Sequence, residues 1–202
     1  AETDMSSSDI QKVVKLSDKI RKAGNELVGL MRKNYDQLMR TKRYRKLLKL
    51  YGSTKDKKKR KYLSEQLNEM QKQYDVTWDF CRKSMIFIGK KYNVDAVFAL
   101  AKAEDIWRGM EKCLYGNGSI LHFSKYGDLP CIRAKQMNRG IPIFVKDNKL
   151  QFKLGRTVFG IKINDRFQTD EVNAMLDYLA EPEIMNNKAV QTLVDEAYCI
   201  DT

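Results

Sequence analysis

The chain has 202 residues, 43% hydrophobic and 10% aromatic, which suffices for one domain or two small ones with apolar cores. No stretch approaches 18 consecutive apolar residues, so we expect no membrane span. The formal net charge of +12 is concentrated: residues 32–61 hold 14 Lys and Arg against 2 acidic residues, and the rest is balanced.

The first eight residues are acidic and serine-rich and lack the basic-then-apolar order of a signal peptide. We therefore expect residues 1–8 to be a disordered leader. The four cysteines are scattered along the chain, which is typical of reduced, buried thiols in the cytoplasm. A structural zinc site usually takes four soft ligands in close pairs, so we expect neither a metal site nor a cofactor.

Residues 9–114 contain no proline, and their apolar residues recur at helical spacing. A first helical stretch follows the capping-type run 6–9, and a second includes Tyr35 to Tyr51. The run 52–54 interrupts the second, with Thr54 as a candidate N-cap of the next helix.

A third stretch includes Tyr62 to Tyr74, and the same spacing continues as far as Ile88. Asn93-Val94-Asp95 is a turn-and-cap signal before a fourth stretch, from Phe98 to Met110. The first half of the chain is therefore predicted to form a bundle of four or five helices.

The chain changes character at residues 115–118, and from residue 115 onward it holds six of the eleven glycines and all three prolines. The fold class predicted is α+β: a helical bundle over 9–114, then a β-rich domain over 115–202 that is a small antiparallel sheet or part of a barrel with a trailing helix. The expected strands are 119–123, 141–145, 150–154 and 158–163, with a hairpin turn at 147–148 and a helix over 170–180.

The basic segment is the strongest functional signal. Lys42, Arg45, Lys46 and Lys49 share one helical face, where like charges repel unless an anion neutralises them. The phosphate backbone of a nucleic acid would do so, and neighbouring tyrosines could stack on unpaired bases. The candidate contacts are Arg40, Lys42, Arg43, Tyr44, Arg45, Lys46, Lys49, Lys55, Lys57, Lys58, Lys59, Arg60 and Lys61, with Tyr51 as a second stacking residue.

Three alternatives to nucleic acid remain for this segment. It could be a solvated helix face, a nuclear-localisation-like tract or a surface for anionic membrane. Membrane is disfavoured, because the segment lacks the apolar aromatic face of an interfacial helix. Catalysis is disfavoured as well, because His122 is the only histidine and has no evident partner. We expect this chain alone not to be an enzyme.

The second half resembles the TnpB-like proteins of bacterial transposons and the compact type V CRISPR effectors related to them. The resemblance covers roughly residues 105–202. It is carried by Gly116-Asn117-Gly118, His122-Phe123, Lys125-Tyr126-Gly127, Ile132, Lys135, Gly140-Ile141, Leu150 to Phe152 and Gly160-Ile161-Lys162-Ile163.

In that family a helical recognition lobe joins an oligonucleotide-binding barrel, the wedge domain, and a RuvC nuclease domain and a zinc ribbon normally follow. The metal-binding acids and the CxxC pairs of those later domains have no counterpart here. The resemblance therefore implies the non-catalytic, guide-RNA-binding portion of an RNA-guided DNA endonuclease, ending inside its barrel.

The partners that the resemblance implies are a guide RNA, a target DNA duplex or RNA–DNA heteroduplex, and the remaining nuclease portion. The setting it implies is the cytoplasm of a bacterium, with the gene on the chromosome, a phage or a transposon. Two alternatives stay open: a stand-alone phage or transposon regulator that competes for guide RNA or effector, and a complete small enzyme with an unusual site. The contacts implied by the resemblance are His122, Lys125, Tyr126, Arg133, Lys135 and Arg139.

Overall fold

The computed structural model describes residues 2–4, 7–115, 118, 120–127, 132–135, 140–146, 149–154 and 157–162. The chain divides into two compact units, a helical unit of Gln11–Lys135 and a strand unit of Ala1–Ile10 with Gln136–Thr202. The α+β class is thus confirmed. The division differs from the expected one at residue 114, because residues 120–127 and 132–135 belong with the helices and residues 1–10 with the strands.

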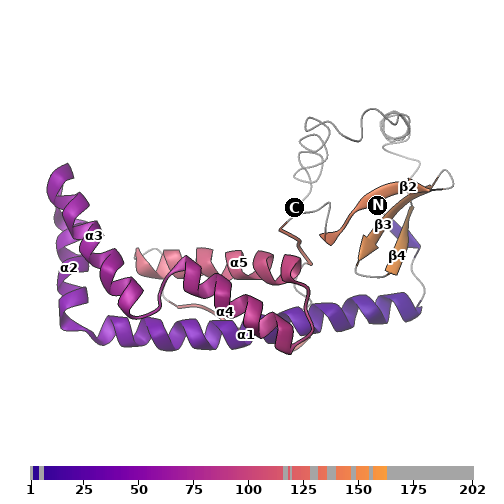
Figure 1. The fold of residues 1–202 in the computed structure, drawn as a ribbon, viewed down its shortest axis with the longest axis horizontal. Coiled ribbons are helices and arrows are strands. Elements are labelled where there is room, and N and C mark those ends of the chain that lie inside the picture. The colour runs from indigo at the N-terminus through magenta and orange to yellow at the C-terminus, as the bar shows by residue number, and fades with distance from the viewer. Residues whose placement is uncertain are drawn as a thin grey trace. The chain divides into compact units, whose positions relative to one another are not determined.

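The described residues form five helices (Figure 1). They are α1 (Ser7–Arg40), α2 (Lys42–Ser53), α3 (Lys57–Gln73), α4 (Trp78–Lys91) and α5 (Ala96–Leu114). The predicted number of helices is confirmed, but two boundaries differ. The first helix continues to Arg40 without a break near Tyr35, and the third ends at Gln73 although the apolar spacing continues to Ile88.

The ends of α3 and α4 explain why the helical spacing of apolar residues did not predict the break after residue 73. Asp75 and Asn93 adopt positive φ angles of 56° and 55°, the left-handed conformation that terminates many helices. In each case the following residue closes the turn with a backbone hydrogen bond. Val76 N–H donates to Gln71 O at 2.8 Å, and Val94 N–H donates to Gly89 O at 2.8 Å. Both valines are buried, so each helix end is fixed by backbone bonds and an apolar anchor.

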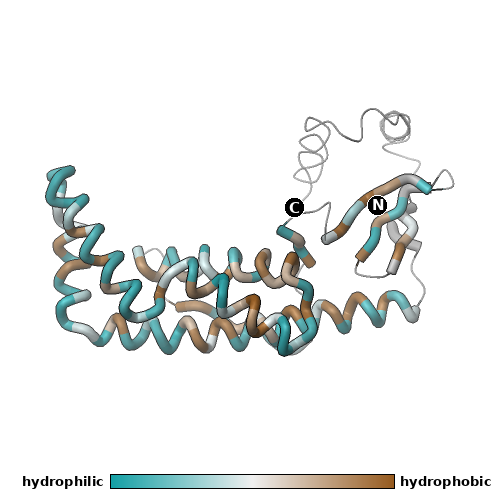
Figure 2. The backbone as a smooth tube through the Cα atoms, viewed as in Figure 1, coloured by the Kyte–Doolittle hydropathy of each residue, from teal (hydrophilic) through white to brown (hydrophobic). Residues whose placement is uncertain are grey.

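The core of the helical unit is made by apolar side chains of α1, α4 and α5, and their positions follow the predicted spacing. The two last helices approach closely at Gly89, where an added Cβ would lie 3.1 Å from the Ala99 Cβ. Figure 2 shows the apolar positions along these helices and the mostly hydrophilic free end of α2 and α3. Fully buried members of the core are Ala23, Leu27, Met31, Cys81, Met85, Ala99 and Ala103.

The strand unit contains a four-stranded antiparallel sheet in the order β1-β4-β3-β2. Its strands are β1 (Glu2–Asp4), β2 (Ile143–Lys146), β3 (Lys149–Leu154) and β4 (Thr157–Lys162). Because β1 pairs with β4 and α1 begins at Ser7, the expectation of a disordered leader is wrong for these residues.

Three of the four expected strands are confirmed, with boundaries shifted by one or two residues. Phe152 and Phe159 face each other across β3 and β4 with ring centroids 4.9 Å apart, as expected for cross-strand aromatic pairs. Lys146 pairs with Lys149, so residues 147–148, the expected turn, lie between paired positions but outside the described residues.

Two other expectations about the second half are not met. Residues 120–123 belong to no strand, so the strand expected over 119–123 is wrong there. Among the described strands no pairing joins β1 to β2, and what the structure shows is an open sheet. The expected helix over 170–180 lies outside the described residues.

Candidate nucleic-acid interface

Most of the predicted cations lie on two helices that pack side by side, α2 and α3 (Figure 1). We call residues 42–73 the basic hairpin. Its interior is apolar: Tyr44 is fully buried, and Leu63, Leu67 and Met70 of α3 are buried too. The Gln71 amide donates a 3.1 Å hydrogen bond to the Tyr44 phenol oxygen, so the polar atom that Tyr44 brings into the interior has a partner.

The burial of Tyr44 corrects its expected role. A ring with no exposed surface cannot stack on a base, so Tyr44 is part of the hairpin's core and not a nucleic-acid contact. Burial also raises the pKa of its phenol. The spacing of Tyr44, Leu47, Leu48 and Tyr51 contained this information, because positions i, i+3, i+4 and i+7 share the inner face of α2.

The hairpin joins α1 at a sharp elbow. Thr41 has extended backbone angles and interrupts the helix between α1 and α2. Its hydroxyl donates to the Tyr74 phenol at 3.1 Å, which ties the elbow to the residue that ends α3. Both ends of the hairpin are therefore anchored at one place.

Asp56 fixes the turn at the far end of the hairpin. It is the N-cap of α3, and its carboxylate accepts hydrogen bonds from the Lys58 and Lys59 amides at 2.8 and 3.3 Å. Thr54, the expected N-cap, instead ends α2, and its hydroxyl donates to the Leu50 carbonyl at 2.6 Å. An acid inside a run of lysines thus has a structural role that the sequence analysis missed.

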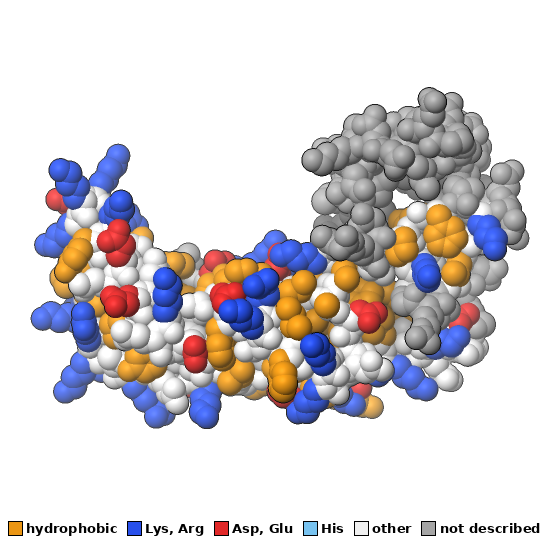
Figure 3. Space-filling view, in the orientation of Figure 1, with side chains coloured by type: hydrophobic (Ala, Val, Ile, Leu, Met, Phe, Trp, Pro, Cys, Tyr) orange, Lys and Arg blue, Asp and Glu red, His pale blue; other side chains and the backbone are white. Residues whose placement is uncertain are grey.

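The outer faces of the hairpin carry cations that no described acid neutralises. All twelve predicted Lys and Arg contacts from Arg40 to Lys61 are exposed, and none forms an ion pair with any residue that the structure describes. Figure 3 shows Lys and Arg side chains projecting from this part of the molecule in several directions. Lys42, Arg45, Lys46 and Lys49 lie opposite the inner face of α2, as predicted.

Several cations elsewhere in the helical unit are paired with acids. Asp18 binds Arg21 and Lys22 at 2.7 and 2.8 Å, and Asp79 binds Arg82 and Lys83 at 3.1 and 2.6 Å. These contacts lower the pKa of both carboxyl groups, with the hydrogen bond from the lysine as the largest cause. Other cations of this unit, such as Arg32 and Lys90, also have no acidic partner among the described residues, so the hairpin is distinguished by how many unpaired cations lie close together in its sequence.

One shallow recess on the hairpin combines charge with an aromatic ring. The Arg60 guanidinium lies 4.7 Å from the centre of the Tyr51 ring and links α3 to α2. Lys57 and Lys61 line the same recess, with Ser64 and Glu65. Tyr51 is half-buried and already covered by Arg60, so stacking on a base would require the arginine to move.

The contacts implied by the family resemblance differ in their surroundings, since two of the cations are paired with acids. The Arg133 guanidinium lies 2.7 Å from Asp105 and 3.6 Å from Glu104, and the Lys135 ammonium binds Glu104 and lies over the Trp78 ring. Both cations hold residues 132–135 against α5. Neither is therefore free to bind a phosphate, which corrects the expected role of both. The remaining members are His122, Lys125 and Tyr126, which are exposed, and Arg139, which lies outside the described residues.

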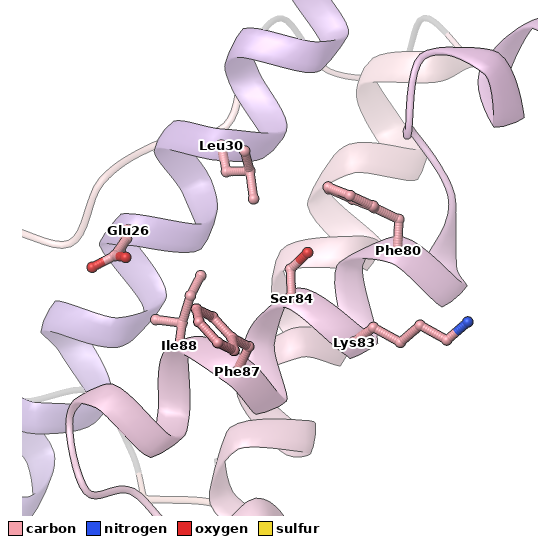
Figure 4. Close-up of a pocket in the computed structure, with 7 residues that line it drawn as sticks. All are labelled: Glu26, Leu30, Phe80, Lys83, Ser84, Phe87 and Ile88. Carbon is pink, nitrogen blue, oxygen red and sulfur yellow. The ribbon is translucent and has the colours of Figure 1, made fainter.

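A second concavity, between α1 and α4, lacks the chemistry of a polar site (Figure 4). Its volume is about 480 Å³, and Leu30, Phe80 and Phe87 dominate its lining. Glu26 at one end is held by Lys91 and Tyr92 at 2.8 Å each, which lowers its pKa. Lys83 at the other end is paired with Asp79, so no charged group of the lining is free for a ligand.

Neither of the two cysteines in the described part of the chain has the surroundings of a reactive thiol. Burial raises the pKa of the Cys81 thiol to about 12, and it also raises that of Cys113, so both cysteines are poor nucleophiles. No group of three or more His, Cys, Asp or Glu in the described part of the chain is placed to hold a metal ion. The described helices include none that is long and apolar enough to cross a membrane.

Removing the Asp56 cap should loosen the hairpin turn. We expect Asp56→Ala to lower the free energy of unfolding by about 1 kcal/mol, because two amides at the start of α3 lose their acceptor. Urea denaturation followed by circular dichroism measures this. Asp56→Asn is the matched control, since it removes the same charge but keeps a capping oxygen, and equal losses in both variants would contradict the capping role.

Comparison with known proteins gives no match, whether with protein-family models, with curated proteins or with solved structures.

Proposed function

We propose that this chain binds structured RNA through the basic hairpin. The observation that carries the proposal is the set of exposed cations on α2 and α3 that have no acidic partner among the described residues. Phosphate oxygens neutralise such a surface and release the counterions condensed on the nucleic acid, which supplies free energy of binding.

The width of the hairpin favours RNA over the major groove of DNA. Two packed helices, each about 10–12 Å across, do not enter a groove about 12 Å wide together, and insertion of one helix would leave the cations of the other outside the groove. The same double layer can lie across the wide, shallow minor groove of an A-form helix or against folded RNA. Recognition would then depend on backbone shape and charge more than on base edges.

The finer proposal follows the resemblance to TnpB-like proteins and type V effectors. In this finer proposal the RNA is a guide RNA, and the chain is the non-catalytic portion of an RNA-guided DNA endonuclease. The chain would also contact the target duplex or heteroduplex. The helical unit would correspond to the recognition lobe and the open sheet to part of the oligonucleotide-binding barrel. Because Arg133 and Lys135 are paired with acids of α5, most of the RNA contacts would come from the hairpin.

A direct binding measurement tests the proposal. We expect a folded stem-loop RNA to bind more tightly than duplex DNA of the same length in a filter-binding assay at about 50 mM salt, where phosphate contacts are strong. Equal affinities would retain nucleic-acid binding and overturn the preference for RNA. Absence of binding to both would overturn the proposed function.

A further inference from the structure

Two exposed aromatic rings stand on the surface of the helical unit, away from the basic hairpin. Phe123 is 49% exposed and Tyr126 is 89% exposed, so burial of apolar surface does not account for the position of Tyr126. Each ring is accompanied by an arginine of α1. The Arg32 guanidinium lies 5.1 Å from the centre of the Phe123 ring, and the Arg21 guanidinium lies 5.5 Å from that of Tyr126.

The segment that carries these rings, residues 120–127, is held firmly on the helices. The Asn25 side chain makes two hydrogen bonds with the Ser124 backbone, donating to its carbonyl and accepting from its amide at 2.9 Å each. Leu121 is buried against Gly109, where an added Cβ would lie 2.8 Å from the leucine side chain. The backbone is therefore anchored on both sides of Phe123 and two residues before Tyr126, which reduces the conformational entropy lost when the segment binds a ligand.

The charges around the two rings suit a phosphodiester chain. Arg32 and the exposed Lys33 have no carboxylate partner among the residues that the structure describes, whereas Arg21 is paired with Asp18. Arg32 is eight residues before Arg40, the first of the twelve predicted Lys and Arg contacts, which corresponds to about 12 Å along α1. Arg32 and Lys33 therefore bring positive charge close to the first ring, and the exposed Asp36 is the one charged residue between them and Arg40.

The spacing of the two rings fits separate bases of one strand. Their arginines are eleven residues apart, which places them on nearly the same face of α1 and about 16 Å apart along it. The rings themselves are three residues apart in the chain, so at most about 11 Å separates their Cα atoms. At about 3.4 Å per nucleotide, a stacked strand covers that distance with about three nucleotides. Each arginine lies over one face of its ring, and both rings are more exposed than Tyr51, so a base would stack on the other face. Any base can do so, because every base has a π-face.

We infer that Phe123 and Tyr126 form a stacking platform for unpaired bases, so that the RNA bound by the hairpin continues along α1 as a single strand. The inference rests on the proposed function, because it needs the hairpin to hold the neighbouring phosphates. It adds a residue, Phe123, that the sequence analysis did not select, and it specifies that the ligand includes an unpaired segment. Paired bases are excluded, because their faces are covered by their neighbours in the duplex.

The test compares two oligonucleotides that differ only in their bases. An oligouridine of about 16 nucleotides, at the upper end of common single-strand site sizes, is titrated against an abasic strand of equal length and charge. We expect the protein to bind oligouridine more tightly by about 5- to 150-fold for each ring that stacks. Phe123→Ala with Tyr126→Ala should abolish this preference and leave the affinity for the abasic strand unchanged.

Two further variants control for folding. Replacing both rings with Trp retains stacking and should retain the preference, while Ile120→Ala removes an exposed apolar side chain of the same segment and should change nothing. Equal affinities of the unmodified protein for the two strands, or a preference that survives the double Ala change, would overturn the inference while leaving hairpin binding intact. If neither strand nor the stem-loop RNA binds, the proposed function fails, and the inference fails with it.

Discussion

The affinity for structured RNA should fall by a thousandfold or more when salt is raised from about 50 to 200 mM, if six to ten phosphates are neutralised. Twelve exposed cations between Arg40 and Lys61, without acidic partners in the described structure, suffice to neutralise that many phosphates. Each phosphate contact displaces condensed counterions, and added salt opposes their release. A plot of log Kd against log salt concentration should have a slope of about 5 to 9.

The measurement is a series of filter-binding titrations at constant pH, with one stem-loop RNA and several salt concentrations. Raising the osmolarity with sucrose in place of salt is the control, because it leaves counterion release unaffected. A flat response to salt would show that the hairpin cations do not contact phosphates, even if RNA binds. Binding would then have to arise from groups other than the hairpin.

Much of the helical unit could be predicted from the sequence, because its helices are amphipathic and its packing follows the 3.6-residue repeat. Leu27, Met31 and Met85 are buried as the spacing indicates, and the outer face of α2 is charged as expected. The break at residues 74–77 was missed, since it depends on a positive φ at Asp75, a conformation that Asp adopts without an obvious sequence signal.

The sequence predicted where the cations of the candidate site are concentrated, but not which cations pair with acids. The density of cations identified the hairpin, yet whether Arg133 binds a phosphate or an acid depends on Asp105, 28 residues earlier in the chain. The same holds for Phe123, whose arginine partner is 91 residues earlier, on α1. Helical and strand periodicities describe local geometry only, so long-range pairs of this kind require the fold.

Reversing the charge of the outer face of α2 should abolish RNA binding without unfolding the chain. The side chains of this face point away from the hairpin core and take part in no ion pair with a described residue, so their replacement breaks no ion pair within that part of the fold. Glu has a helix propensity close to that of Lys and Arg, which preserves α2. The variant is Lys42→Glu, Arg45→Glu, Lys46→Glu and Lys49→Glu, and filter binding with circular dichroism measures both outcomes.

A charge-neutral form of the variant measures how many phosphates this face of α2 binds. With Gln at the same four positions, the salt slope should fall by about four, because each cation that binds a phosphate adds about one unit to the slope. The matched control reverses four exposed cations outside the hairpin, namely Lys15, Lys33, Lys90 and Arg108.

This control produces the same change in net charge as the four Glu substitutions, so it separates local contact from the general attraction between a basic protein and RNA. We expect it to weaken binding of the stem-loop far less than the α2 variant does. Lys33 is adjacent in sequence to Arg32 of the aromatic platform, and its loss should matter mainly for single-stranded ligands. Equal weakening in the two variants would mean that net charge alone drives binding, and the hairpin would then be one solvated surface among several.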